Sequence, residues 1–209
     1  KDAKNVTIKG EGTLNGNGRK WWERIWAKTL EEARPCLVYF ENCENVKLLD
    51  ITLTNSPAWT VHPLFSENVV VSGITIKNPA DSPNTDGINP DSCRNVRISD
   101  CIIDVGDDCI AIKSGVEDSL VKEPCENITI TNCVMVHGHG GIVIGSEAAG
   151  GVRNVVVSNC VFQDTDRGIR LKTRRRRGGS MEKLTFSNII MDRVMCPFVF
   201  NMYYFCGKL

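Results

Sequence analysis

Apolar and polar residues alternate along six short segments of the chain that resemble one another. The segments read ENVKLLDITL from Glu44, ENVVVSGITI from Glu67, RNVRISDCII from Arg94, ENITITNCVM from Glu126, RNVVVSNCVF from Arg153 and EKLTFSNIIM from Glu182. A weaker seventh copy, KNVTIKGEGTL, starts at Lys4. The first residues of the six copies are 23, 27, 32, 27 and 29 positions apart. Because an alternation of period two is typical of β-strands, each copy predicts at least one strand.

A single short strand pair cannot bury its apolar face alone, whereas stacked copies of it can. The repeats therefore predict an all-β, right-handed parallel β-helix with about seven recognisable coils, each adding strands about 4.8 Å above the coil below. Residues 1–209 are expected to form one such domain, and the chain is expected to be a fragment of a longer one. The alternative is an ordinary β-sandwich, but antiparallel sandwiches do not require repeats that align in this way.

Two residue types recur at fixed places in the repeats. One corner position is asparagine in six copies, where asparagine tolerates a left-handed turn and can hydrogen-bond to its neighbours: Asn5, Asn45, Asn68, Asn95, Asn127 and Asn154. Another position is expected to face the interior and holds small or apolar residues: Ile51, Gly73, Cys101, Cys133, Cys160 and Ile189. Among the ten cysteines, some of a further group remain candidates for disulfides: Cys93, Cys109, Cys125, Cys196 and Cys206.

One stretch interrupts the repeats. Residues 19–35, RKWWERIWAKTLEEARP, predict either a short helix or a long loop. Its three tryptophans are expected to pack against the side of the solenoid, although sugar-binding sites use the same residue type.

Composition narrows the possible functions. Lys and Arg together equal Asp and Glu at 25 each, so the formal net charge is zero, and neither nucleic acid nor a membrane surface is an expected partner. No apolar run approaches the roughly 20 residues of a membrane span, and the first residues lack the apolar stretch of a signal peptide. Zinc-type Cys/His spacings are absent, so no cofactor is expected. A monomer is expected.

Three acids stand out against this background. Asp86 is 21 residues before Asp107, which is 32 residues before His139, which in turn is 31 residues before Arg170. These are coil lengths, so the side chains are expected to stack on one face. The neighbours Asp107 and Asp108 would point to opposite sides of a regular strand, but a bend at Gly106 would let both reach one groove.

Three acids near His, Arg and Lys suit glycosidic bond cleavage. That reaction uses one protonated acid on the leaving oxygen and a carboxylate that activates water, expected about 6.5–9.5 Å apart for inversion. Crowding of like charges keeps one acid protonated. A solvated turn or a calcium site is the alternative, since three carboxylates also suit a hard cation.

Four motifs carry a resemblance to a known family. NTDGI at 84–88, GDDC at 106–109, GHG at 138–140 and RLK at 170–172 resemble, in order and spacing, the signature segments of the polygalacturonases, the pectin-degrading glycoside hydrolase family 28. The similarity extends over nearly the whole chain. It implies a secreted or periplasmic enzyme that hydrolyses α-1,4-galacturonosyl bonds of polygalacturonate with inversion.

The resemblance also implies roles for the catalytic residues. Asp107 corresponds to the general acid, while Asp86 and Asp108 correspond to the pair that holds and deprotonates the attacking water. His139 corresponds to the residue that supports the protonation state and geometry of the acid.

Further positions correspond to the substrate-binding residues. Arg170 and Lys172 are expected to bind a galacturonate carboxylate, for which the planar fork of arginine is well suited. Asn84 is expected to contact substrate. A tyrosine that closes the family's substrate site corresponds best to Tyr204, with Tyr203 as the competitor.

Some features leave alternatives open. The segment GIVIGSEAAGG after GHG resembles that of bacterial and plant relatives, several of which act from chain ends, so endo or exo action is undecided. His137 is interpreted as structural and His62 as a residue that lines the groove. The run Arg174–Arg177 fits a solvated loop or a contact with the polyanionic substrate.

The competing functions are three. A pectate lyase shares the β-helix but relies on calcium and an arginine base, and the three acids with GHG favour a hydrolase. A second candidate is a hydrolase of substituted pectin, rhamnogalacturonan or xylogalacturonan. A third, if the chain is truncated, is a non-catalytic carbohydrate-binding β-helix module.

Overall fold

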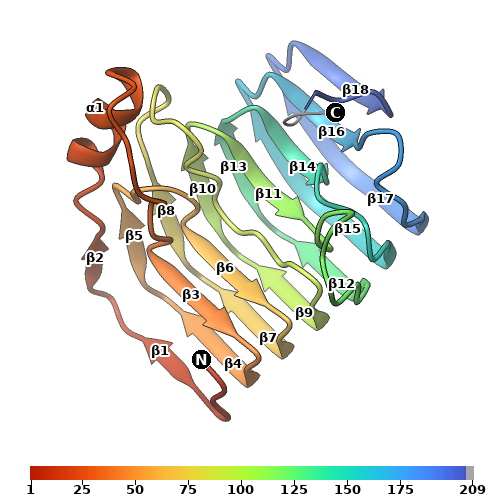
Figure 1. Ribbon diagram of the computed structural model, residues 1–209, viewed down its shortest axis with the longest axis horizontal. Coiled ribbons are helices and arrows are strands. Elements are labelled where there is room, and N and C mark those ends of the chain that lie inside the picture. The colour runs from red at the N-terminus through yellow and green to blue at the C-terminus, as the bar shows by residue number, and fades with distance from the viewer. Residues whose placement is uncertain (206–209) are drawn as a thin grey trace.

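The computed structural model describes residues 1–205, which wind into a parallel β-helix with three stacks of strands (Figure 1). The first stack contains β1 (Thr7–Lys9), β4 (Glu44–Leu49), β7 (Glu67–Ser72), β9 (Arg94–Ser99) and β12 (Cys125–Thr131). The second stack contains β2 (Thr13–Asn15), β5 (Thr52–Thr54), β8 (Thr75–Lys77), β10 (Ile102–Val105) and β13 (Val134–His137). Two long strands, β15 (Val152–Gln163) and β17 (Met181–Asp192), continue through both stacks.

The third stack is made by β3 (Val38–Glu41), β6 (Val61–Leu64), β11 (Asp108–Ile112), β14 (Gly140–Ile144), β16 (Arg167–Lys172) and β18 (Cys196–Asn201). Single bridges through Ile88 and Asp91 connect β6 to β11. All the strand pairs that link the stacked strands are parallel, so the predicted β-helix is confirmed. The solenoid has about five turns, fewer than the seven coils expected. Each repeat copy contains one strand of the first stack, whereas a full turn also needs strands in the other two stacks.

The interior of the solenoid is filled by rows of aliphatic side chains. Val46, Val69, Val96, Ile128 and Val155 are in register from coil to coil, and each is at most 1% exposed. Burying one such side chain stabilises the fold by about 1.5–3 kcal/mol. The alternation in the repeats therefore has a direct physical cause, since every second residue of a coil faces this core.

The asparagine row forms at the predicted corner. All six residues have φ between 56° and 59°, the left-handed region that asparagine tolerates better than most residues. Each side-chain amide donates to the carbonyl oxygen of the asparagine one coil earlier, over 3.0–3.2 Å from Asn45 to Asn154. The ladder satisfies the amides and ties neighbouring coils together.

The cysteine row is also confirmed. Cys101, Cys133 and Cys160 are each 1% exposed in one interior row. The expected member from the second repeat is wrong, however: Ile74 is buried there, while Gly73 is exposed at a turn with φ +67°. The nine cysteines in the part of the chain that the structure describes are free thiols, so none of the candidate pairs forms there; Cys206 lies outside that part.

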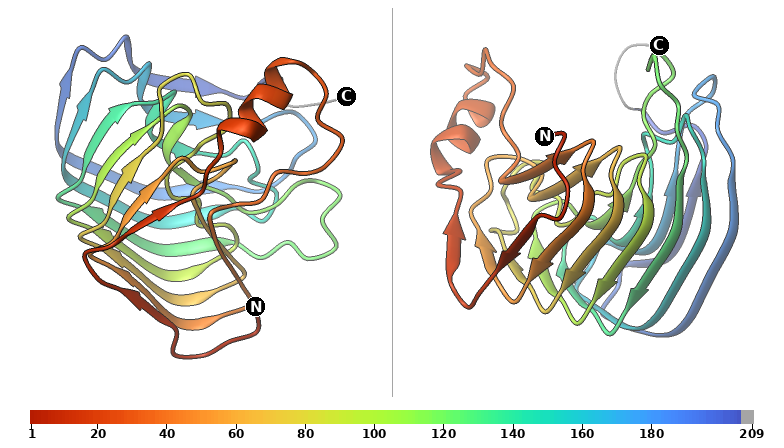
Figure 2. Two further views of the ribbon diagram at one scale, coloured as in Figure 1. Left: turned by 90° about the vertical axis from the view of Figure 1, so that its left-hand side faces the viewer. Right: turned by 90° about the horizontal axis from the view of Figure 1, so that it is seen from below.

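The interrupting stretch is a short helix followed by a long loop. Helix α1 (Arg19–Trp26) lies beside the first coils, as both views in Figure 2 show. Trp22 is 2% exposed, and its Nε1 donates to the Ser56 carbonyl over 3.0 Å, which confirms packing against the solenoid. Trp26 is exposed beneath Arg19. Within residues 1–205, no helix has the length and apolar character needed to cross a membrane.

Candidate active site

The predicted site residues gather on the outer face of the third stack. A pocket of about 210 Å³ opens there. It is lined by Trp59, Asn84, Asp86, Asp107, Asp108, Lys113, Ser146, Glu147, Lys172, Tyr204 and Phe205. These side chains come from segments between Trp59, which follows β5, and Phe205, which follows β18, so only the winding of the solenoid brings them together.

Asp86 is held in place by the backbone around it. It precedes the bridge residue Ile88, and the Gly87 amide donates to the Asp108 carbonyl over 3.0 Å. On the other side, the Asp86 carbonyl accepts from the Thr60 amide over 2.8 Å. Asn89 Nδ2 donates to Asp86 Oδ2 over 3.1 Å. The carboxyl group is therefore fixed between two coils and is 5% exposed.

A bend before β11 lets two neighbouring acids reach the same pocket. Gly106 and Asp107 form the bend, and Asp108 is the first residue of β11. A side chain at Gly106 would collide with the carbonyl oxygen of Ser82 and lie 2.7 Å from that of Pro79. Glycine thus permits the close approach of two backbones, and the expected bend is confirmed.

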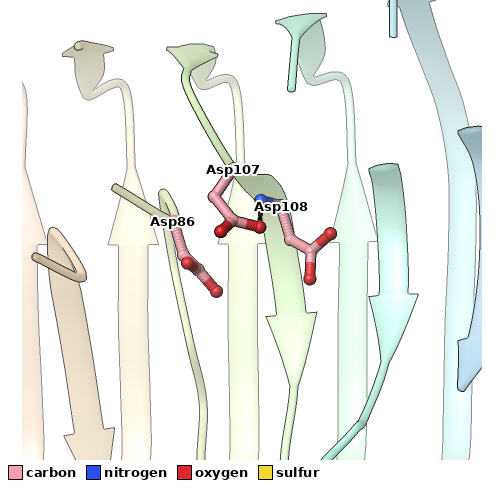
Figure 3. Close-up of side chains that lie close together, drawn as sticks. All are labelled: Asp86, Asp107 and Asp108. Carbon is pink, nitrogen blue, oxygen red and sulfur yellow. Dashed lines mark hydrogen bonds between the residues drawn. The ribbon is translucent and has the colours of Figure 1, made fainter. Parts of the chain in front are cut away.

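The three acids form one compact cluster (Figure 3). One carboxylate oxygen from each of Asp86, Asp107 and Asp108 lies within 4.8 Å of the others. The Asp108 amide also donates to Asp107 Oδ1 over 2.8 Å. The distances between the nearest carboxylate oxygens are shorter than the roughly 6.5–9.5 Å expected between the acid and the base.

Two cations on β16 neutralise Asp108. Lys172 Nζ lies 2.7 Å from Asp108 Oδ2, and Arg170 Nη1 lies 3.3 Å from Asp108 Oδ1. Both come from β16 and are two residues apart, so they share one strand face. The Tyr204 ring lies 4.9 Å from Lys172 Nζ and 5.3 Å from the Arg170 guanidinium carbon. Tyr203 instead contacts Arg175 and is exposed, so the geometry favours Tyr204 at the pocket.

His139 and Asn84 both contact Asp107. His139 Nδ1 lies 3.2 Å from Asp107 Oδ1, and Asn84 Nδ2 donates to Asp107 Oδ2 over 3.4 Å. All eight residues named from the sequence thus belong to one connected group.

Burial and charge set different protonation preferences within the triad. Burial, and then the charge of Asp107, raise the pKa of Asp86 to about 8. For Asp107, burial acts to raise the pKa, but the hydrogen bond and charge of His139 outweigh it and the pKa is lowered. The same hydrogen bond raises the pKa of His139. The sequence analysis expected the protonated acid to be Asp107, whereas burial and charge in the free site favour the proton on Asp86.

The sequence reasoning missed a buried pair beside the triad. Lys113 Nζ lies 2.7 Å from Glu147 Oε2 and 3.9 Å from Asp86 Oδ2, and it lies over the Trp59 ring at 4.5 Å. Lys113 is 3% exposed. Burial acts to lower the pKa of Lys113, but Glu147 and Asp86 outweigh it and the pKa is raised. Burial acts to raise the pKa of Glu147, yet Lys113 lowers it to about 2.

A signal for this pair exists in the sequence. Lys113 directly follows the segment GDDCIAI, and Glu147 ends the IGSE segment. Because charged residues are rarely buried, one that ends a buried strand directly after the GDDC motif is a candidate for the same pocket.

The remaining residues singled out from the sequence make contacts outside the acid triad. His137 Nδ1 lies 2.9 Å from Asp104 Oδ1, away from the acids. His62 is buried between Tyr39 and Trp59. In the arginine run, Arg174 and Arg177 both pair with Glu117, so these two hold loops together.

The triad has the composition of a cation site, because three carboxylates lie within reach of one ion. Both Asp108 oxygens, however, already contact Lys172 and Arg170. Lys113 is a third cation at the cluster. The positive charge that a metal would supply is therefore already provided by side chains.

Comparison with known proteins identifies the class. Residues 1–209 match the family described as Glycosyl hydrolases family 28, and the chain belongs to that family. A "Probable polygalacturonase" of Vitis vinifera is 38% identical over 197 residues, which cover 92% of this chain and 40% of that protein. The polygalacturonase from Erwinia carotovora ssp. carotovora superposes with a TM-score of 0.89 at 31% identity, covering 98% of this chain and 56% of that one.

A second solved structure is similarly close. The exopolygalacturonase from Thermotoga maritima has a TM-score of 0.83 at 34% identity and covers 95% of this chain and 54% of that one. The chain spans about 40% of the length of the Vitis vinifera relative.

Proposed function

We propose that this protein is a polygalacturonase that hydrolyses α-1,4-galacturonosyl bonds of polygalacturonate outside the cytoplasm. The observation that carries the proposal is the triad of Asp86, Asp107 and Asp108, with Lys172 and Arg170 on Asp108 and His139 on Asp107. The group combines one protonated carboxyl group, two ionised carboxylates and fixed cations. Hydrolysis of an anionic polysaccharide uses such an acid, such a base and positive charge that binds the substrate.

Exposure supports the division of roles. The Asp107 side chain is 16% exposed, against 5% for Asp86 and 1% for Asp108. Asp107 is thus the acid that a leaving oxygen in the groove reaches, and it is the general acid of the proposal. The deeper pair, Asp86 and Asp108, holds and deprotonates the water.

The triad supplies the proton as a unit. In the free site Asp86 carries it, because its pKa is raised to about 8. The two acids have oxygens within 4.8 Å, so one proton serves the cluster, and its position follows the charges that substrate brings. A singly protonated triad is therefore the active form.

The cations give the proposed preference for acidic sugars. Lys172 and Arg170 lie beside Tyr204, where a galacturonate carboxylate would meet two positive charges and an aromatic ring. Arg170 is 13% exposed and Lys172 is 7% exposed, so Arg170 is the more accessible of the two.

The test is hydrolysis of polygalacturonate and of reduced trigalacturonate, followed by reducing ends and product sizes. The proposal expects saturated products, short oligomers or monomers according to endo or exo action. Unsaturated products that absorb in the near ultraviolet would indicate a lyase. Activity on rhamnogalacturonan or xylogalacturonan alone would indicate the substituted-pectin alternative.

Inversion is part of the proposal and is tested separately. It rests on the family resemblance and on the two acids that remain to hold one water when Asp107 donates. The carboxylate spacing does not support it, since inverting enzymes have wider separations. Proton NMR of the first product formed would show the β-anomer for inversion and the α-anomer for retention.

A further inference from the structure

The loop that follows α1 brings one arginine to the candidate site. Arg34 lies in this loop, more than 70 residues before Asp107 in the sequence. Its Nη1 donates to the carbonyl oxygens of Pro57, over 3.0 Å, and of Pro83, over 2.5 Å. Its Nη2 donates to Asn84 Oδ1 over 2.6 Å. The guanidinium therefore joins the loop to two separate coils immediately next to Asn84.

These contacts determine which way the Asn84 amide faces. An asparagine amide has one acceptor oxygen and one donor nitrogen, and the two can exchange places by a flip. Because Arg34 can only donate, it requires the oxygen on its own side. The nitrogen then faces Asp107 Oδ2, at 3.4 Å. A flipped amide would present its oxygen to the carboxylate and its nitrogen to the guanidinium, and both contacts would be lost.

Asn84 has few other means of holding this orientation. Its φ is 55°, in the left-handed region, and its side chain faces the open pocket. Burial lowers the pKa of Arg34, while the charges of Asp86 and Asp107 act in the opposite direction, so the guanidinium lies within electrostatic reach of the triad.

We propose that Arg34 is a positioning residue for the reaction: it locks the Asn84 amide so that its nitrogen donates to Asp107. The inference rests on the proposed hydrolase function, and it assigns a role to the segment that interrupts the repeats. Arg34 acts through Asn84 and does not itself touch the reacting atoms. The hydrogen bond from Asn84 fixes the Asp107 carboxyl at the angle needed to reach the leaving oxygen.

A double-mutant cycle tests the link. Arg34→Met keeps the aliphatic stem and removes every donor, and we expect kcat on polygalacturonate to fall about 3- to 30-fold with little change in KM. Asn84→Ala should have a similar effect. In the Asn84→Ala background, Arg34→Met should change kcat by less than about 2-fold. Arg19→Met, in the same segment but paired with Glu23, is the control and should match the wild type.

Two results would overturn the inference. Additive losses in the cycle would mean that Arg34 acts independently of Asn84. A rise in KM with unchanged kcat would mean that Arg34 binds substrate directly.

A second variant covers the case in which Arg34→Met does not fold. Asn84→Asp keeps the side-chain oxygen that accepts from Arg34. It removes the side-chain nitrogen that donates to Asp107. The new carboxylate also faces Asp107 with like charge, so we expect kcat to fall at least as strongly as in Asn84→Ala, while the contact with Arg34 keeps the loop in place. Wild-type kcat in Asn84→Asp would overturn the inference.

A readout without turnover separates this inference from the proposed function. If the wild type does not hydrolyse polygalacturonate, the proposed function fails, and the link is judged from the side-chain amide signals of Asn84 in ¹⁵N NMR spectra. Arg34→Met should shift these signals and Arg19→Met should not. Unshifted signals in Arg34→Met would overturn the link whatever the activity.

Discussion

Lys113 and Asp86 lie 3.9 Å apart between nitrogen and oxygen, and both side chains are at most 5% exposed. Lys113 is not free to neutralise Asp86, because its shorter contact, at 2.7 Å, is to Glu147. Glu147 therefore competes with Asp86 for one buried positive charge. The competition helps Asp86 to keep a raised pKa beside two other acids and three cations.

The first prediction concerns the alkaline limb of the activity profile. If the singly protonated triad is active, kcat/KM should fall as pH rises through about 8, where Asp86 loses its proton. In Glu147→Gln, Lys113 loses its carboxylate partner and its charge acts mainly on Asp86, so the pKa of Asp86 should fall. The alkaline limb of the profile should then move to lower pH. The measurement is kcat/KM from pH 4 to 10.

The charges of Asp107, Lys113, Asp108, Lys172 and Arg34 act on Asp86, and the variant removes the carboxylate that pairs with Lys113. Glu126→Gln is the control, because Glu126 pairs with Arg94 and Arg153 on another face. An unchanged limb in Glu147→Gln would contradict the proposed competition.

The second prediction concerns stability. The pKa of Asp86 is about 4 in an unfolded chain and about 8 in the fold. The contribution of Asp86 to the free energy of unfolding is therefore fully present below about pH 4, and it is lost as pH rises through about 8. Asp86→Asn removes this loss, so the variant should gain Tm relative to the wild type at pH 8 but not at pH 4. Each kcal/mol gained corresponds to about 2–4 °C in a chain of this size.

Calorimetric melts of both proteins at the two pH values check this expectation. An equal change in Tm at pH 4 and pH 8 would show that Asp86 does not titrate differently in the folded and unfolded chains.

The third prediction concerns Asp107. Asp107→Asn removes proton donation, which typically contributes about 10²–10⁴-fold to the rate, while binding of oligogalacturonate persists. Turnover and isothermal titration with trigalacturonate measure the two effects. Full turnover in Asp107→Asn would exclude it as the general acid.

The fourth prediction concerns the two cations. Sequence reasoning alone expects Arg170→Ala and Lys172→Ala to raise KM by weakening carboxylate binding. The structure adds a loss of kcat for Lys172→Ala, because Asp108 is 1% exposed and would lose its 2.7 Å partner. Steady-state kinetics should show the larger kcat loss for Lys172→Ala and the larger KM rise for Arg170→Ala, whose contact with Asp108 is 3.3 Å. The reverse order would contradict these assignments.

The fifth prediction is that hydrolysis needs no metal ion. Three lysine and arginine side chains already supply positive charge at the triad. Excess EDTA should leave the rate of reducing-end release unchanged. Loss of activity that calcium restores would point to the lyase alternative.

The sequence by itself determined the solenoid, and it predicted eight residues that gather at the candidate site. The alternation in the repeats reflects whether a side chain faces the core, and this property is local to each strand. The recurrence of Asn45, Asn68 and Asn95 at one coil length reflects a turn that each coil must make again. For the same reason Asp86, Asp107, His139 and Arg170, separated by coil lengths, were expected on one face.

Only the tertiary structure decided the distances and the charges. The bend at Gly106 brings the acids within 4.8 Å, closer than their chemistry suggested, because backbone packing against Pro79 and Ser82 sets the turn. Burial and neighbouring charges favour the proton on Asp86, and because they act through space they leave no trace in residue spacing. Arg34 and Glu147 reach the site from segments outside the repeat pattern, so no period predicts them.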